Sequence, residues 1–121
     1  MLDKNFEDTY KSIASTYINK CVILSHLSLH EEAIETIKTS LDNLDRYQKR
    51  FGATISEREE GEIKHMMMLA YYNIAVEYEH LAQGEMAIKF YEMAFKQAKE
   101  VGNWSIKNQI IAALKKLKNN R

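Results

Sequence analysis

Residues 68–99, MLAYYNIAVEYEHLAQGEMAIKFYEMAFKQAK, constrain the fold of this chain more than any other stretch. Their apolar residues recur at intervals of three and four, which places them on one face of an α-helix on each side of a break at 82–84. Small residues alternate with bulky ones on both faces, so two helix backbones can approach closely. These positions are Tyr71, Ile74, Ala75 and Tyr78, followed by Ala87, Ile88, Tyr91, Ala94 and Phe95. The stretch therefore predicts an antiparallel helical hairpin.

The rest of the chain also favours helices, because it contains no proline and only four glycines. Apolar spacing predicts five helices, at about 3–27, 30–51, 56–81, 84–101 and 104–118. Ser-x-x-Glu patterns at Ser28 and Ser56 predict helix N-caps, Asn103 or Ser105 can cap the last helix, and Gly52 and Gly102 are expected to end helices. A chain of 121 residues buries one core. We predict an all-α fold with a single domain over 1–121.

An internal repeat is the second constraint. When the chain is shifted by 54 residues, 17–34 aligns with 71–88, and eight of the eighteen positions are identical. The identical pairs are Tyr17/Tyr71, Asn19/Asn73, Val22/Val76, His26/His80, Leu27/Leu81, Glu31/Glu85, Ala33/Ala87 and Ile34/Ile88. The first helix continues the same apolar face in both directions, with Phe6, Tyr10, Ile13, Tyr17, Cys21 and Leu24. The repeat predicts two related hairpins, with lengthened helices between them.

The run Tyr71-Tyr72-Asn73-Ile74-Ala75, with Tyr78, Ala87-Ile88, Tyr91 and Ala94-Phe95, resembles a tetratricopeptide repeat (TPR). Ala75 stands where that family most often has glycine, and Lys99 replaces its closing proline. The resemblance implies one well-matched repeat at about 68–99, a degenerate lengthened repeat at about 14–47 and a C-terminal capping helix. These would form antiparallel helical hairpins stacked as a short TPR-like solenoid, which would also suit a fragment of a larger protein.

The resemblance further implies a concave groove lined by the first helix of each hairpin. The residues expected in this peptide-binding groove are Asn19, Val22, His26, Leu69, Tyr72, Asn73, Val76, His80 and Lys107. In TPR proteins that grip an extended peptide, an asparagine at the place of Asn19 or Asn73 bonds the ligand backbone, because an amide satisfies both N–H and C=O groups. The same asparagine can instead bond within its own repeat. Ser15 and Leu69 stand where the family's carboxylate clamp has basic residues, so the groove favours an amphipathic helix or an extended apolar segment.

No motif of catalysis or cofactor binding is present in the sequence. It lacks a glycine-rich phosphate loop, His-Glu-x-x-His and Cys-x-x-Cys. The single cysteine, Cys21, excludes a cysteine-rich metal site. The four histidines are dispersed, although stacked hairpins could bring His26 and His80 side by side. We predict no enzymatic activity, no cofactor and no metal.

The charge balance argues against nucleic acid and membrane partners. Seventeen basic and seventeen acidic residues cancel, so no net charge attracts phosphate backbones or acidic membranes. No run approaches the roughly 18 apolar residues of a membrane span, and the N-terminus is too polar for a secretory signal. We expect a cytoplasmic location.

The last helix carries two features with alternative interpretations. Trp104, the only tryptophan, is expected to be half-exposed beside the fourth helix, either as a cover for that junction or as part of an interface. Lys115, Lys116 and Lys118 supply the polar outer face that the terminal unit of a repeat protein needs.

Together these patterns predict a non-enzymatic protein–protein interaction module, with a scaffold or adaptor role, that binds a peptide or helix of a partner protein. The alternative is a structural segment that completes a longer solenoid or forms a homo-oligomer such as a homodimer, with no separate ligand.

Overall fold

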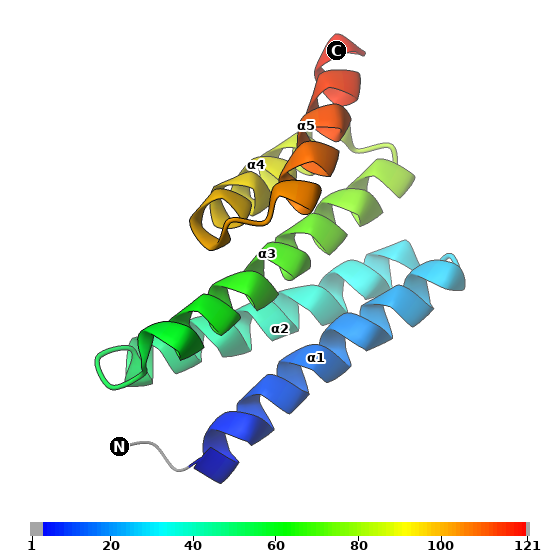
Figure 1. The fold of residues 1–121 in the computed structure, drawn as a ribbon. Helices are drawn as coiled ribbons and strands as arrows, with labels where there is room; N and C mark the ends of the chain where they lie inside the picture. The colour runs from blue at the N-terminus through cyan, green and yellow to red at the C-terminus, as the bar shows by residue number, and fades with distance from the viewer. Residues whose placement is uncertain (1–3, 121) are drawn as a thin grey trace.

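Five α-helices follow one another with short turns between them. The computed structural model describes residues 4–120, apart from the side chains of 4–11, 13 and 14. The helices are α1 (Lys4–His26), α2 (His30–Phe51), α3 (Glu57–His80), α4 (Gly84–Val101) and α5 (Trp104–Asn119). Each helix packs on the next and α1 also contacts α3, while α3 and α5 pass in front of α2 and α4 in Figure 1. No strand occurs within 4–120, so the predicted all-α fold with five helices is confirmed.

The 54-residue repeat is visible in the core, because positions separated by 54 are buried in both copies. The pairs that are at most 5% exposed in both copies are Cys21/Ala75, Ala33/Ala87, Ile34/Ile88, Ile37/Tyr91, Ser40/Ala94 and Leu44/Ala98. Ala75, Ala87 and Ala94 are each 0% exposed, as the spacing of small residues predicts. Of the expected stripe on α1, Cys21 is buried and Leu24 packs partly buried against the core. Phe6, Tyr10 and Ile13 lie outside the described side chains.

The two hairpin turns have the same backbone conformation. Ser28 and Ala82, which are 54 residues apart, both have positive φ angles, of 60° and 57°. The N–H of the following residue reaches back over the turn in each case, from Leu29 to the Leu24 carbonyl and from Gln83 to the Tyr78 carbonyl, both at 2.9 Å. This is the hydrogen-bond pattern that commonly ends helices in a left-handed residue.

The left-handed turn corrects one sequence prediction. Ser28 was expected to cap α2, but Leu29 precedes α2 and no side chain caps its first turn. The physical reason is that Ser28 already ends α1 in the left-handed conformation, which is not the extended backbone of an N-cap. In the second hairpin, Gly84 already begins α4, so Ala82 occupies the position that favours glycine.

The other caps agree with the sequence. The Ser56 hydroxyl accepts from the Glu59 N–H at 3.2 Å, and the Asn103 side chain accepts from the Ile106 N–H at 3.0 Å. Gly102 ends α4 with a left-handed φ of 73°. Gly52 ends α2 differently, in the right-handed region, where a Cβ would lie 2.4 Å from the Gln48 carbonyl oxygen.

The long middle helices are held together at their far ends by a second, smaller core. Leu44 and Tyr47 of α2 are buried against Ile63 of α3, with Phe51 and Met66 packed around them. The charged start of α3 therefore packs on one side against α2. This second core explains how α2 and α3 can be longer than a single hairpin requires.

Replacing Ala82 with glycine should stabilise the protein. A non-glycine residue in the left-handed region costs about 1–2 kcal/mol, which glycine would avoid. Glycine also gives the unfolded chain more conformational freedom, and this offsets part of the stabilisation. We expect Ala82→Gly to raise the free energy of unfolding by about 0.5–1 kcal/mol, measured by urea denaturation. Gly102→Ala is the matched reverse change and should lower it, because a Cβ there meets open space and only the backbone strain is added. A loss of stability in Ala82→Gly would contradict the assigned turn.

Candidate binding face

The face formed by α1, α3 and α5 carries eight of the nine residues expected in a groove. The exposed ones are Asn19, Val22, His26 and His80, and the half-buried ones are Leu69, Tyr72, Asn73 and Val76. They come from two helices that contact each other, α1 and α3. The structure thus brings these residues to neighbouring helices, as the repeat predicts.

The wall on α1 is made by Asn19, Val22 and His26, which succeed one another at intervals of three and four on one side of the helix. Val22 is 42% exposed, which is high for a large aliphatic side chain. Ile18 packs against the core from the same helix. On α1, Ile18 is therefore fixed by the core, while the side chains of Val22 and Asn19 are open to solvent.

The floor on α3 is made by residues that are shared between the core and solvent. Leu69 and Val76 are partly buried and pack against the main core. Asn73 lies between them, and its side-chain N–H donates to the Leu69 carbonyl at 2.9 Å. Of the two roles that the sequence left open for this asparagine, the structure shows the hydrogen bond within its own helix. Among the described residues its Oδ1 makes no hydrogen bond, so it can still accept one from a ligand N–H.

On the other side of α3, the face is bordered by α5, and Tyr72 joins the two helices. Its hydroxyl donates to Gln109 Oε1 of α5 at 3.1 Å, and its ring meets Tyr91 edge to face at a centroid distance of 5.8 Å. Burial, and then the negative charge of Glu79, raise the pKa of the Tyr72 phenol, which stays a neutral donor. Gln109 was not among the residues expected in the groove, although Lys107 of the same helix was.

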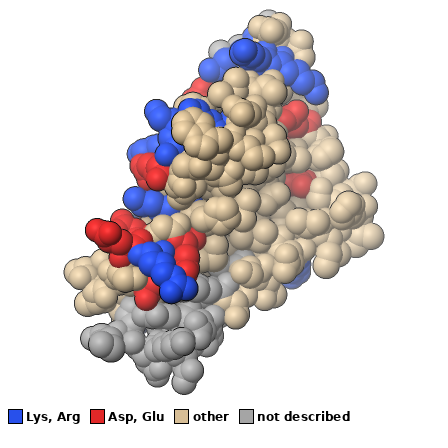
Figure 2. Space-filling model, viewed as in Figure 1, with Lys and Arg blue, Asp and Glu red and all other residues tan. Residues whose placement is uncertain are grey.

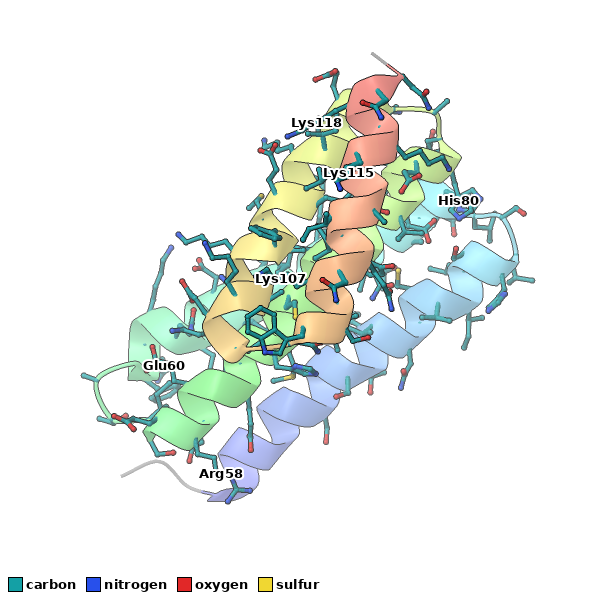
Figure 3. The ribbon with its side chains drawn as sticks, turned by 45° about the horizontal axis from the view of Figure 1, so that its top comes forward. Arg58, Glu60, His80, Lys107, Lys115 and Lys118 are labelled. Atoms are coloured by element: carbon teal, nitrogen blue, oxygen red, sulfur yellow. The ribbon has the colours of Figure 1, made fainter. Side chains whose placement is uncertain are left out.

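Lys107, the ninth expected residue, lies on the other side of α5. Its ammonium group stands over the Trp104 ring at 4.3 Å and the Phe95 ring at 5.8 Å from their centroids. Phe95 belongs to α4, whereas Gln109 reaches Tyr72 of α3. Figure 3 shows Lys107 on the side of α5 that is turned toward α4. Lys107 and Gln109 thus serve two different surfaces.

A polar cluster at one end of the face was not predicted as a cluster. His30 Nδ1 lies 2.5 Å from Glu77 Oε2, and the His30 ring stacks on the His80 ring at 4.5 Å. Glu77 is 3% exposed, so its carboxyl group depends on this partner. The available signal was the position of Glu77 on the apolar stripe, three residues after Ile74.

The cluster also bears on the possibility that stacked hairpins bring His26 and His80 side by side. His80 stacks on His30 of α2, whereas His26 of α1 is exposed. Over the residues that the structure describes, no group of three His, Cys, Asp or Glu side chains is arranged to hold a metal ion. No helix in that part of the chain combines the length and apolarity that crossing a bilayer requires.

The face is poor in charge. Figure 2 shows this side of the molecule mostly in tan, with Lys, Arg, Asp and Glu side chains gathered mainly at its left and upper edges. The eight expected residues on α1 and α3 include no Lys, Arg, Asp or Glu. The chemistry available to a ligand is therefore apolar contact, amide hydrogen bonding and imidazole.

In comparisons with protein-family models, with curated proteins and with solved structures, no match to this chain was found.

The His30–Glu77 contact should contribute to stability. His30→Ala leaves a buried carboxyl group without its partner, so we expect the free energy of unfolding to fall by about 2–3 kcal/mol. The measurement is urea denaturation at neutral pH. His26→Ala removes an exposed histidine of the same kind and should change stability by less than about 0.5 kcal/mol. Equal effects of the two substitutions would show that the contact is not stabilising.

Cys21 should make stability fall at alkaline pH. Burial, and then the charge of Glu77, raise the pKa of its thiol from 9.0 to about 12. Because the thiol ionises at lower pH in the unfolded chain than in the folded one, its contribution to the free energy of unfolding is fully present below pH 9 and is lost as pH rises toward 12. Between pH 9 and 10 we expect a loss of about 1 kcal/mol in the free energy of unfolding. The Cys21→Ala protein should have a flatter profile in this window; identical slopes would contradict the burial of the thiol.

Proposed function

We propose that this chain is a non-enzymatic protein–protein interaction module, with a scaffold or adaptor role, that holds a peptide or helix of a partner protein against the face of α1, α3 and α5. The observation that carries the proposal is that Val22 of α1 is 42% exposed, while Leu69 and Val76 of the contacting helix α3 are only partly buried. Apolar groups left open beside one another mark interaction sites more often than solvated surface.

The chemistry of the face favours a particular class of ligand. It offers aliphatic contacts from Val22, Leu69 and Val76, and amide groups from Asn19 and Asn73. An extended or helical segment with apolar side chains would bury the first set and bond the second. A strongly acidic or basic tail would find no opposite charges among these residues, so such a ligand fits less well.

The resemblance to tetratricopeptide repeats supports the same proposal. The first helices of the two hairpins lie on one side, and the residues that align with ligand-binding asparagines in that family are Asn19 and Asn73. Asn73 spends one N–H on Leu69, which leaves Oδ1 and the other N–H for a ligand. On this basis Asn73 would accept from a ligand backbone N–H, while the exposed Asn19 would supply both functions.

A second function is favoured by two other residues of α1. Ile23 and Leu27 are 60% and 63% exposed, and both lie on the same side of Val22, about 100° and 140° round the helix. Apolar residues on the outer side of a first helix suit a neighbouring helix of a longer solenoid or a second copy of the chain. Under this alternative the chain is a structural segment with no separate ligand.

A peptide selection would test the proposal. A random library of 12-residue peptides is selected against the wild-type chain, and the affinity of the enriched peptides is measured by fluorescence anisotropy. We expect apolar or amphipathic sequences, and we expect Val22→Glu and Val76→Glu each to weaken binding at least tenfold. Asn73→Ala should weaken the binding of extended peptides.

The matched control is Ile23→Glu, which adds the same charge on the same helix but outside the face. It should leave peptide affinity unchanged while weakening any self-association seen by analytical ultracentrifugation. If Ile23→Glu weakened peptide binding as much as Val22→Glu, the ligand would not lie on the proposed face. Failure to enrich any peptide, together with dimers at micromolar concentration that Ile23→Glu weakens, would favour the structural alternative.

A further inference from the structure

A second surface runs along the junction of α4 and α5, across α5 from the face described above. We name it the α4–α5 seam, and its residues are Phe95, Lys99, Trp104, Lys107, Ile111, Leu114, Lys115 and Lys118. They include none of the residues assigned to the face of α1, α3 and α5. The seam therefore stands or falls separately from the proposed function.

The floor of the seam is apolar and open. Phe95, Ile111 and Leu114 line a hollow of about 350 Å³, and a smaller hollow of about 140 Å³ lies beside Trp104. Trp104 is 67% exposed, the largest value among the large apolar side chains that the structure describes. The sequence left its role open between a cover and an interface. Its exposure does not suit a cover.

The cations of the seam are mostly not paired with carboxylates. Lys107 stands over Trp104 and Phe95, and Lys99 stands over Phe95 at 5.6 Å. In the described part of the chain, only Lys118 has an anionic partner here, Glu92 at 3.2 Å. Lysines that rest on aromatic rings are held close to the floor while their charge remains available.

The lysines of α5 also lie in one line. Lys107, Lys115 and Lys118 all appear on the side of α5 that faces α4 in Figure 3. Lys116, next in sequence to Lys115, falls more than a quarter turn further round the helix, away from this side. Lys107 and Lys118 thus lie before and after Ile111 and Leu114 on one stripe of α5, and Lys115 lies at the edge of that stripe, so cations border the apolar floor that an amphipathic helix would cover.

In the second hairpin, the corresponding side of the first helix, α3, is covered by the helix that follows it, α4. On α3, Tyr71 and Tyr78 face α4 and meet Phe90, with ring centroids 6.3 and 5.6 Å apart. On α5, Lys107, Ile111 and Leu114 are spaced by four and then three residues, as Tyr71, Ala75 and Tyr78 are on α3. Within residues 4–120 no further helix follows α5 to cover them. Among the described residues, the side of α5 beside α4 thus has the position of a hairpin interface, and no helix packs on it.

We propose that the α4–α5 seam docks an acidic amphipathic helix of a partner protein, which lies along α5 as α4 lies along α3. The apolar side of that helix would cover Phe95, Ile111 and Leu114. Its flanking Asp or Glu side chains would meet Lys99, Lys107 and Lys115. The 16 residues of α5 are about 24 Å long, so a docked helix of about four turns would span the seam.

Trp104 gives a direct signal for this interaction, because it is the only tryptophan in the chain. The probe is a synthetic 16-residue helix without tryptophan, with leucines at intervals of three and four and glutamates on both flanks. We expect the Trp104 emission to move to shorter wavelength on titration, with a micromolar dissociation constant that rises with salt. Lys107→Glu and Lys115→Glu should each weaken binding at least tenfold.

The control variant is Lys116→Glu, which makes the same change of charge on the next residue but away from the seam. It should change the dissociation constant by less than twofold. A control peptide with serines in place of leucines should not bind. Circular dichroism of each variant shows whether α5 still folds, and Lys115→Glu is informative even if Lys107→Glu is not, because Lys115 is exposed.

Several results would overturn the proposal. No shift of Trp104 emission at 100 µM probe would exclude it, as would equal losses in Lys115→Glu and Lys116→Glu. Tighter binding of phosphatidylserine vesicles or of oligouridylate than of the helix would assign the seam to a membrane or to RNA. An emission shift that grows with protein concentration, with no probe present, would assign it to a second copy of the chain.

Discussion

Close approach of helix backbones at small residues is the constraint on which this structure depends. Ala75, Ala87 and Ala94 are completely buried, and Ser40 is buried in the position equivalent to Ala94. With so little bulk at the contact, the aromatic rings beside it can interlock, as Tyr78 and Phe90 do. A larger residue at any of these alanines would push α3 and α4 apart and displace the face that Tyr72 joins to α5.

The two left-handed turns give that packing its regularity. Ser28 and Ala82 are different residues with the same backbone conformation, and neither is glycine. The strain is accepted because the turn ends one helix and sets the antiparallel direction of the next within three residues. Since the turn is the same in both hairpins, α1 and α3 present equivalent residues to the same side. The candidate face is a consequence of this equivalence.

Spacing rules predicted the helices and the α1–α3 part of the face, because both follow from periodicity along the chain. They could not predict contacts between side chains from different helices. The His30–Glu77 contact joins α2 to α3, and the repeat gives no hint of it, since Ile23 and Gly84 occupy the equivalent positions. The prediction that Lys107 lies in the groove was wrong for the same reason. Spacing predicted the helix that contains Lys107, but its contact with Phe95 of α4 shows on which side of α5 it lies.

The two sides of α5 show why zero net charge says little about where partners bind. Gln109 on one side bonds Tyr72 and borders a face with no formal charges on its α1 and α3 residues. Lys107 on the other side belongs to a row of cations above aromatic and aliphatic groups. Acidic residues elsewhere, such as Glu60 and Glu100 around Lys64, balance the total without neutralising that row. Because screening confines such interactions to about 8 Å at physiological ionic strength, a ligand responds to the local row and not to the sum. One short helix can therefore separate two surfaces with different chemistry.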